Sequence, residues 1–234
     1  TVRGQIARGY RIPTLNDRYW IPGGNPDVLP EDAFHVEAGI NWSQNFRRWN
    51  LVVDGTIYKT WINDMIVWTP EGNLWSPANF QKVNSYGVEV SAKGSLSSDK
   101  YKLNAEIDYS LTRSINETEE DPLFNNKQLA YVPLHSGRLF VSLNVKSWTL
   151  DTRANVTGLR YTTLDNDESA SLDPYVLLDA SVSKRFLFRK MNFVLRMDGL
   201  NLFNVYYENL KYHAMPGRNY AVSILLNFNN QQSI

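Results

Sequence analysis

The sequence predicts an all-β chain of antiparallel strands that belong to a transmembrane β-barrel. Apolar and polar residues alternate with a period of two along successive segments, as in residues 86–96 and 101–111. Strand side chains point to opposite faces in turn, so each segment has one apolar face and one polar face. Short and long connections alternate between the segments, and aromatic residues gather at the segment ends. Lipid outside and a polar lumen inside account for this combination.

The periodicity indicates about ten strands along the chain. We expect them at residues 1–10, 34–46, 50–67, 84–97, 100–113, 136–145, 148–162, 175–187, 191–205 and 219–228. Short connections are expected near residues 47–50, 97–100, 145–148 and 188–190, and long ones at 11–33, 68–83, 114–135, 163–174 and 206–218. Outer-membrane barrels have short periplasmic turns and long extracellular loops. All ten prolines fall outside the interiors of these expected strands, where proline would interrupt the hydrogen-bond ladder.

Aromatic side chains gather at the end of the strands that carries the short connections. They are Trp42, Phe46, Trp49, Tyr101, Trp148, Phe186, Phe188, Phe193 and Phe228. We interpret this group as the periplasmic aromatic girdle of a barrel. The alternative is the general preference of aromatic residues for strands.

A tight turn at residues 97–100 would set the register of the two segments beside it. The expected pairs are Lys93 with Asn104, Ser91 with Glu106, and Glu89 with Asp108. Polar residues then meet polar residues on one face. Like charges directly opposite each other destabilise a sheet, so we expect a cation close to Glu89 and Asp108.

The composition excludes several classes of function. The 24 Lys and Arg balance the 24 Asp and Glu, which gives no nucleic-acid footprint. The chain has no cysteine, so disulfides and thiolate metal sites are ruled out. Its three histidines, His35, His135 and His213, lack metal-ligand spacing, and no catalytic triad or phosphate loop is recognisable. We therefore expect neither an enzyme nor a bound cofactor.

Two segments resemble a known family. Residues 8–17 read RGYRIPTLND and residues 24–31 read GNPDVLPE, which is similar to the "GFRAPSLNEL … GNPDLKPE" region of TonB-dependent outer-membrane receptors. Residues 201–204 read NLFN and residues 215–218 read MPGR, and a final strand follows. This ending resembles the "NLFD … MPGR" ending of the same family, with Asn204 where the family often has Asp.

The resemblance implies the C-terminal part of a 22-stranded barrel that a plug domain fills. All 234 residues would belong to this part, with the plug and about twelve strands outside the sequence, which begins within a strand at Thr1. The implied function is active transport across the bacterial outer membrane, energised by TonB through the plug. A scarce ferric siderophore or cobalamin would be captured in the extracellular loops, and the convex barrel wall would face outer-membrane lipid.

Two groups of residues are candidate contacts. Possible substrate-contacting residues in or near the long connections are Arg18, Trp20, Trp75, Tyr131, Tyr207, Tyr212 and His213. Aromatic and Arg side chains dominate binding energy when a ligand buries them, although they could equally form an outer girdle and the loop core. Possible plug-facing residues of the lumen are Glu89, Glu106, Asp108, Arg153, Asp179 and Arg196. The alternative for these is a solvated lumen wall, and a plug could supply the cation that Glu89 and Asp108 require.

Two other functions stay open at this point. One is a passive outer-membrane channel or an adhesin barrel, and the other is an outer-membrane hydrolase with catalytic residues at the barrel rim. A plug and a TonB-box segment in a full-length sequence would favour the receptor. The elements at 24–31 are expected to shape a loop, because proline presets turns and Asn and Asp cap them.

Overall fold

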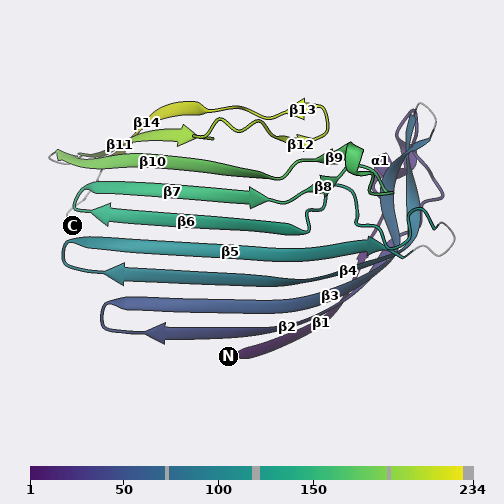
Figure 1. Cartoon of the computed structure of the whole chain (residues 1–234), viewed down its shortest axis with the longest axis horizontal. Coiled ribbons are helices and arrows are strands. Elements are labelled where there is room, and N and C mark those ends of the chain that lie inside the picture. Colours follow the sequence, from purple (N-terminus) through teal and green to yellow (C-terminus); the bar gives the residue numbers. More distant parts are fainter. Residues whose placement is uncertain (72–73, 118–121, 189–190, 229–234) are drawn as a thin grey trace, which may run out of the picture.

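The computed structural model describes residues 1–71, 74–117, 122–188 and 191–228, which form one large curved sheet (Figure 1). Ten strands lie in the order β1-β2-β3-β4-β5-β6-β7-β10-β11-β14. Every neighbouring pair runs antiparallel. The ten long strands lie side by side in the order in which they occur along the chain. The all-β prediction and the number of long strands are confirmed.

The strands of the sheet agree with the expected segments to within a few residues at most ends. They are β1 (Val2–Arg11), β2 (Glu31–Asn45), β3 (Trp49–Glu71), β4 (Leu74–Ser97), β5 (Tyr101–Asn116), β6 (His135–Val145), β7 (Trp148–Thr157), β10 (Tyr175–Phe188), β11 (Met191–Leu200) and β14 (Asn219–Phe228). Two strands end earlier than expected, at Thr157 and at Leu200. After Leu200 the chain turns at Asn201, whose φ of 48° leaves the extended region.

The long connections contain the remaining elements. These are α1 (Leu15–Tyr19), β8 (Arg160–Tyr161), a 3-10 helix (Glu168–Ala170), β9 (Ser171–Leu172), β12 (Glu208–Leu210) and β13 (His213–Ala214). The strands β8 and β9 form one small two-stranded sheet, and β12 and β13 form another. In the described part of the chain, no helix is long and apolar enough to cross a membrane.

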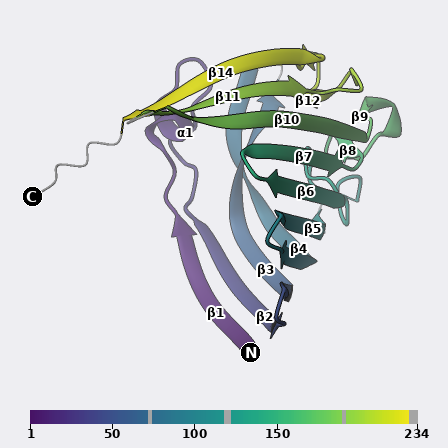
Figure 2. The ribbon, with the colours of Figure 1, turned by 90° about the vertical axis from the view of Figure 1, so that its left-hand side faces the viewer.

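The sheet is an arc when it is viewed along its strands (Figure 2). Strands β1 and β14 form its two edges, and neither has a neighbour on its outer side. The arc has a convex face and a concave face. The short turns lie together at one end of the strands, and the long connections lie at the other end (Figure 1).

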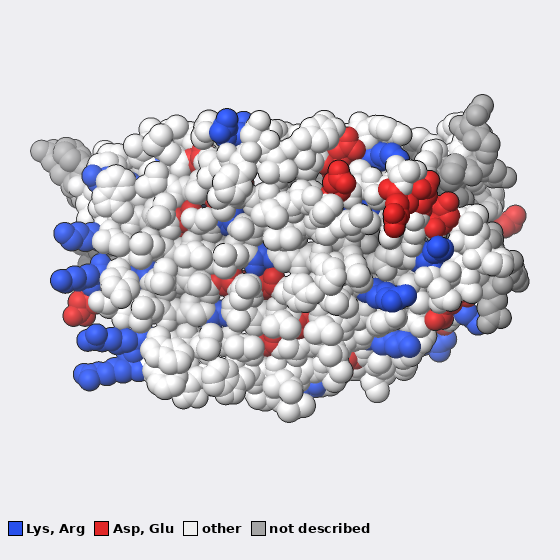
Figure 3. Space-filling model, viewed as in Figure 1, with Lys and Arg blue, Asp and Glu red and all other residues white. Residues whose placement is uncertain are grey.

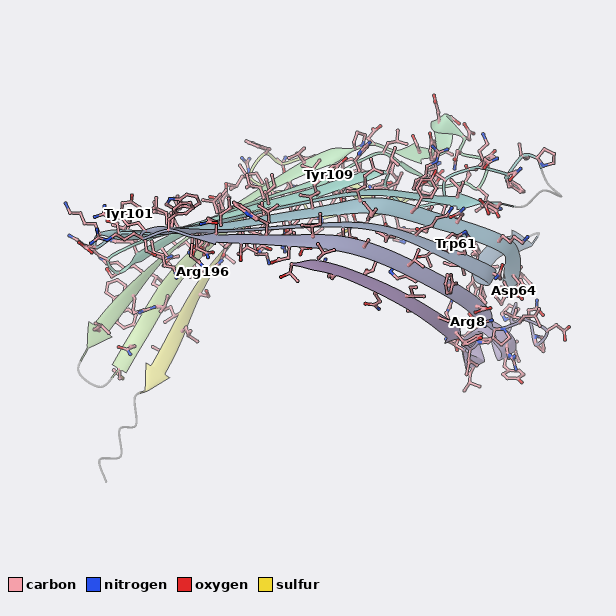
Figure 4. All side chains as sticks on the ribbon, turned by 90° about the horizontal axis from the view of Figure 1, so that it is seen from below. Arg8, Trp61, Asp64, Tyr101, Tyr109 and Arg196 are labelled. Carbon is pink, nitrogen blue, oxygen red and sulfur yellow. The ribbon has the colours of Figure 1, made fainter. Side chains whose placement is uncertain are left out.

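Apolar side chains dominate the convex face, and most charged side chains of the strand interiors lie on the concave face; Lys59, whose ammonium lies 4.8 Å from the ring centroid of Trp61, is an exception near the long connections. Val90 lies opposite Gly55 on β3 and Tyr109 on β5, and Ile107 lies opposite Leu139 on β6. Between its two charged ends the convex face is predominantly uncharged, with scattered charged atoms visible among its other side chains (Figure 3). Tyr109 and Arg196 lie on opposite sides of the sheet (Figure 4). This is the expected division between a lipid-facing wall and a lumen wall.

The expected register between β4 and β5 was wrong, because each residue of β4 pairs two residues further along β5 than predicted. Lys93 lies opposite Glu106, Ser91 opposite Asp108, and Glu89 opposite Ser110. The Ser98 N–H donates to the Tyr101 carbonyl at 2.8 Å, so the turn is centred on residues 99–100, one residue later than expected. Moving a turn by one residue shifts each pairing by two, which leaves every side chain on its face. The like-charged pair between Glu89 and Asp108 therefore does not form.

The expected loop at residues 68–83 was also wrong, because β3 and β4 continue as a two-stranded ribbon. Pairing of β2 with β3 ends at Asn63, and pairing of β5 with β4 begins at Val83. Pro70 and Pro77 lie within this ribbon, opposite Trp75 and Trp68 respectively. These prolines contradict the prediction that every proline lies outside the strands. The ribbon tolerates them because each of its strands has a partner on one side only.

Aromatic side chains pack against each other beside the short turns, as the girdle interpretation predicts. The ring centroids of Phe46 and Trp49 are 3.9 Å apart, and those of Phe186 and Phe193 are 4.6 Å apart. The side chains of Phe188 and Phe228 lie outside the described residues.

The face assignment predicts unequal costs for introducing a charge. Replacing Val90 or Ile107 with Arg should lower the free energy of unfolding in lipid by about 2–4 kcal/mol, because an outward Arg near the bilayer midplane loses its hydration. Replacing Ser91 with Arg should cost much less, because Ser91 faces the lumen opposite Asp108. Unfolding titrations in lipid vesicles measure all three. Equal losses for Ser91→Arg and Val90→Arg would contradict the assignment.

Candidate functional site

The concave wall carries a cluster of charges centred on Arg138 of β6. Its guanidinium lies 2.8 Å from a carboxylate oxygen of Glu106 and 2.7 Å from one of Asp108, both on β5. The ammonium of Lys93 on β4 lies 3.2 Å from Glu106. The cation expected near these acids is thus supplied by the barrel wall itself. No plug residue is required to balance Glu106 and Asp108.

Two further clusters join strands that are not neighbours. Arg3 on β1 donates two hydrogen bonds to Asp54 on β3, at 2.6 and 2.7 Å. Its guanidinium crosses β2 directly over Gly39, where a β-carbon would approach it to 3.0 Å. Arg196 on β11 similarly reaches Asp151 on β7 at 3.3 Å. These pairs reinforce the sheet across its backbone ladder.

A minority of the concave charges lack such a partner. Among the described residues, no oppositely charged group lies within 4.0 Å of Glu89 or Arg153. Arg153 lies opposite Asp179, but the carboxylate of Asp179 accepts the backbone N–H of Asn201 at 2.8 Å. Of the six predicted plug-facing residues, three are therefore paired within the wall, Asp179 anchors a loop, and two are free. A polar groove of about 490 Å³ on this face is lined partly by Arg3, Asp54, Glu89, Asp108 and Arg138.

At the end of the strands that carries the long connections, residues 12–30 dock onto the β3–β4 ribbon. We call this compact unit the first lobe. Asp17 of α1 is its centre and is only 3% exposed. One carboxylate oxygen accepts the indole N–H of Trp68 at 3.0 Å, and the other accepts the N–H and hydroxyl of Thr14, both at 2.8 Å. Thr14 and Asp17 together form a capping box that starts the helix.

The residues of the GNPDVLPE segment complete the first lobe. The Asn25 side chain donates to the carbonyl of Pro77 at 3.1 Å. A Glu31 oxygen accepts the backbone N–H of Ile66 at 2.8 Å and the guanidinium of Arg11 at 2.6 Å. Each of these bonds joins the first long connection to its neighbouring ribbon or strand. The structural interpretation of this segment is supported by its contacts.

The electrostatic environment of Asp17 favours its ionised form. Burial alone would raise the pKa of Asp17, but the hydrogen bonds from Thr14 and Trp68 outweigh this, and the positive charge of Arg11 adds to them. The net effect lowers the pKa of Asp17 below its ordinary value. The first lobe is therefore built around a carboxylate that must be charged at neutral pH.

A second lobe forms where the hairpin of β12 and β13 docks onto β8 and the start of β10. Arg160 is 5% exposed and donates to the carbonyls of Glu208 at 2.7 Å and Asn209 at 3.4 Å. The guanidinium also lies 5.3 Å from the ring centroid of Tyr175, which packs against Tyr207 at 4.7 Å. Burial raises the pKa of the Tyr207 hydroxyl, so this side chain stays neutral. Arg160 was not among the residues predicted from the sequence.

The two motifs near the C-terminal end close the last long connection. Asn201 accepts the N–H of Val205 at 2.9 Å and donates to the carbonyl of Val205 at 2.8 Å. Asn204 accepts the N–H of Arg218 at 2.9 Å, which ties the NLFN segment to the MPGR segment. An amide oxygen at position 204 satisfies this bond as a carboxylate oxygen would. Both motifs therefore have a structural role in this chain.

The predicted loop residues divide between the lobes. In the first lobe, Arg18 donates to the carbonyl of Val28 at 3.3 Å, whereas Trp20 and Trp75 are exposed. In the second lobe, Tyr207 is half-buried, Tyr212 is 85% exposed and His213 is exposed. Tyr131 is exposed and donates its backbone N–H to Tyr161 at 2.7 Å. The exposed members are free to meet a ligand, and Arg18 is committed to the fold of its lobe.

The described residues contain no cluster of three or more His, Asp or Glu side chains arranged to hold a metal ion. The site as a whole consists of two anchored lobes at one end of a charged concave wall. Exposed aromatic side chains lie on both lobes.

A family model described as "TonB dependent receptor-like, beta-barrel" matches residues 1–207. The chain belongs to this family. TonB-dependent receptors are transporters rather than enzymes and reside in the outer membrane of Gram-negative bacteria. The chain has ten strands of such a barrel, with an apolar convex wall and a charged concave wall.

Similar proteins include two vitamin B12 transporters named BtuB. The one from Photobacterium profundum is 26% identical over 232 residues, covering 97% of this chain and 35% of its own length. The one from Vibrio vulnificus is also 26% identical, covering 94% of this chain and 34% of its length. The chain therefore spans about a third of the length of these curated relatives.

Solved structures share the fold. The copper transporter OprC superposes with a TM-score of 0.70 at 14% identity, covering 97% of this chain and 37% of OprC. The ferric yersiniabactin uptake receptor FyuA from Yersinia pestis gives a TM-score of 0.63 at 20% identity, covering 96% of this chain and 34% of FyuA. At these identities the likeness extends to the fold alone.

The first lobe should loosen in acid. A group whose pKa is lowered by folding stabilises the fold above its ordinary pKa, about 3.9 for Asp, and this contribution is lost as pH falls through the lowered value. Replacing Asp17 with Asn should weaken docking by about 1–2 kcal/mol at neutral pH and abolish this acid dependence. Amide hydrogen exchange of residues 14–25 measures the docking. Asp27→Asn, an exposed position in the same connection, is the control and should retain the parent profile.

The second lobe should depend on Arg160. Replacing Arg160 with Gln removes the donors that reach the carbonyls of Glu208 and Asn209, so the hairpin should undock. Exchange of the backbone amides at residues 208–214 should accelerate by about tenfold or more, as expected from losing charge-assisted hydrogen bonds. Lys211→Gln changes the same charge within the hairpin and should leave exchange nearly unchanged. An undisturbed hairpin in Arg160→Gln would show that other contacts hold the lobe.

Proposed function

We propose that this chain forms the C-terminal part of the barrel of an active-transport receptor. The receptor captures a ferric siderophore or cobalamin in its extracellular loops, and TonB drives uptake through a plug domain. The observation that carries this proposal is the pair of anchored lobes at the long-connection end of a family barrel. Buried Asp17 and buried Arg160 each hold a long connection in a defined shape, which a site for a specific ligand requires.

The two edges of the sheet support further strands in the same barrel. Neither β1 nor β14 has a partner on its outer side, and unpaired backbone groups are costly in hydrocarbon. Additional strands that pair with both edges would close the wall. We therefore expect this segment alone to be unable to transport a substrate.

The concave wall supports a plug that docks on selected charges. Glu89 and Arg153 have no oppositely charged partner within 4.0 Å among the described residues, whereas Glu106, Asp108 and Arg196 are paired within the wall. A plug would gain more from meeting a free charge than from disrupting a formed pair. Glu89, which lines the groove described above, and Arg153, elsewhere on the same wall, are thus the contacts we assign to a plug.

The relatives and the nature of the lobes support the proposed substrate class. The names of the relatives include vitamin B12 transporters, and those of the fold neighbours include a ferric yersiniabactin receptor. Exposed aromatic side chains on both lobes suit a large, rigid chelate or corrinoid. Deleting the gene and comparing growth on single iron chelates with growth on limiting cobalamin tests the proposal. Uptake that persists without TonB would indicate a passive channel instead.

The lobes should contribute directly to substrate affinity. Trp20, Trp75 and Tyr212 are exposed, and each should be replaced singly with Ala in the whole receptor. At least one replacement should weaken binding by about 1 kcal/mol or more, roughly fivefold, with unchanged surface expression. Binding assays on intact cells measure the affinity, and Leu123→Ala, an exposed apolar position in another long connection, is the control. Normal binding by all three variants would place the site on the plug or on other loops.

A further inference from the structure

The short-turn end of the sheet is strongly basic. Cationic side chains gather in and beside the short turns, and five of them are here called the basic fringe: Arg47, Arg48, Lys100, Lys146 and Lys184. Lys102 and Arg185 lie beside them, at positions that share a face with Glu106 and Asp179 of the lumen wall. Asp99 is the one carboxylate within the described turns at 45–50, 97–102 and 145–148. Blue side chains project from this end of the convex face, whereas acidic residues gather near the long connections (Figure 3). The balanced total of charges in the sequence hides this asymmetry.

The basic fringe differs from the cations of the lumen wall in its pairing. Arg3, Arg138 and Arg196 each contact a carboxylate on the concave face. Among the described residues, none of the five fringe side chains has a carboxylate within 4.0 Å. Unpaired cations at this density repel each other, so their positive charge is available to an external anion.

The fringe lies at the level where lipid headgroups are expected. Lys184 points to the convex face, and its ammonium lies 4.7 Å from the ring centroid of Trp148 and 5.0 Å from that of Phe186. In the turn between β2 and β3, Trp49, two residues after Arg47, stacks on Phe46. Aromatic belts of membrane proteins sit at the headgroup level. The fringe therefore borders the lipid rather than the lumen, and the short turns that carry it lie along one end of the sheet (Figure 1).

We propose that the basic fringe binds the headgroups of anionic phospholipids in the leaflet that surrounds the short turns. Each fringe cation can reach a lipid phosphate while its stem packs along the aromatic belt. An anionic lipid offers net negative charge, and a zwitterionic lipid offers none. The interaction would select lipid around the barrel and fix its depth in the membrane, and it is independent of the substrate.

Lipid selectivity measured by electron paramagnetic resonance tests this proposal. The complete receptor is reconstituted in phosphatidylcholine vesicles, and the fraction of motionally restricted lipid is compared for spin-labelled phosphatidylglycerol and spin-labelled phosphatidylcholine. The fringe variant carries R47Q, R48Q, K100Q, K146Q and K184Q. The control variant carries K82Q, R113Q, K127Q, K211Q and R218Q, which make the same change of net charge at the long-connection end.

The parent and the control should prefer phosphatidylglycerol by about threefold or more at low salt, and 0.5 M salt should reduce this preference. The fringe variant should show no preference. Equal association of both lipids with the parent, or a preference kept by the fringe variant, would overturn the proposal. If five changes prevent folding, as shown by lost heat-modifiable migration in gels, R47Q/R48Q is compared with K211Q/R218Q and should lose part of the preference. Because the assay uses no substrate, its failure is distinguishable from failure of the transport proposal.

Discussion

The interstrand hydrogen-bond ladder is the constraint on which the rest of this structure depends. Backbone N–H and C=O groups in hydrocarbon have no water to bind, so ten antiparallel strands satisfy them against each other. A ladder forces successive side chains to opposite faces. Charges near the middle of the membrane then face the lumen, and the convex-face lysines Lys59 and Lys184 lie beside aromatic rings toward the two ends of the strands. The convex apolar band and the concave charge clusters are two consequences of the same backbone requirement.

The clusters on the concave wall show how a charged surface can stabilise a sheet. Arg3 crosses over Gly39 to reach Asp54, and Arg196 reaches Asp151 across an intervening strand. The ladder joins each strand only to its immediate neighbours. Bidentate and bridging pairs of this kind add bonds between strands that are separated by a third. The loops follow a related logic, because buried Asp17 fastens one long connection to a neighbouring ribbon. Charged groups thus organise both the wall and its outer end.

Periodicity in the sequence was sufficient to predict strand number, side-chain faces and the alternation of short and long connections. It could not predict the β4–β5 register, because moving the turn from residues 98–99 to 99–100 preserves every face and leaves the pattern unchanged. The ribbon that contains Pro70 and Pro77 was missed because we assumed that a strand pairs on both sides, where proline would interrupt a ladder. Each strand of the ribbon pairs on one side only. Arg160 was missed because only its burial against distant carbonyls distinguishes it from an ordinary loop arginine. The motif segments were located correctly, but their bonding partners lie up to 52 residues away and follow from the fold.

The alternation of faces is the central claim, and site-directed spin labelling along β4 and β5 tests it most directly. The chain has no cysteine, so single cysteines can be introduced without background. In lipid vesicles, labels at Val88, Val90 and Ile107 should be accessible to oxygen dissolved in the bilayer, and labels at Ser91 and Asp108 should be protected from it. Accessibility that rises and falls with a period of two, in this phase, is the result the account predicts. A uniform profile, or the opposite phase, would contradict it.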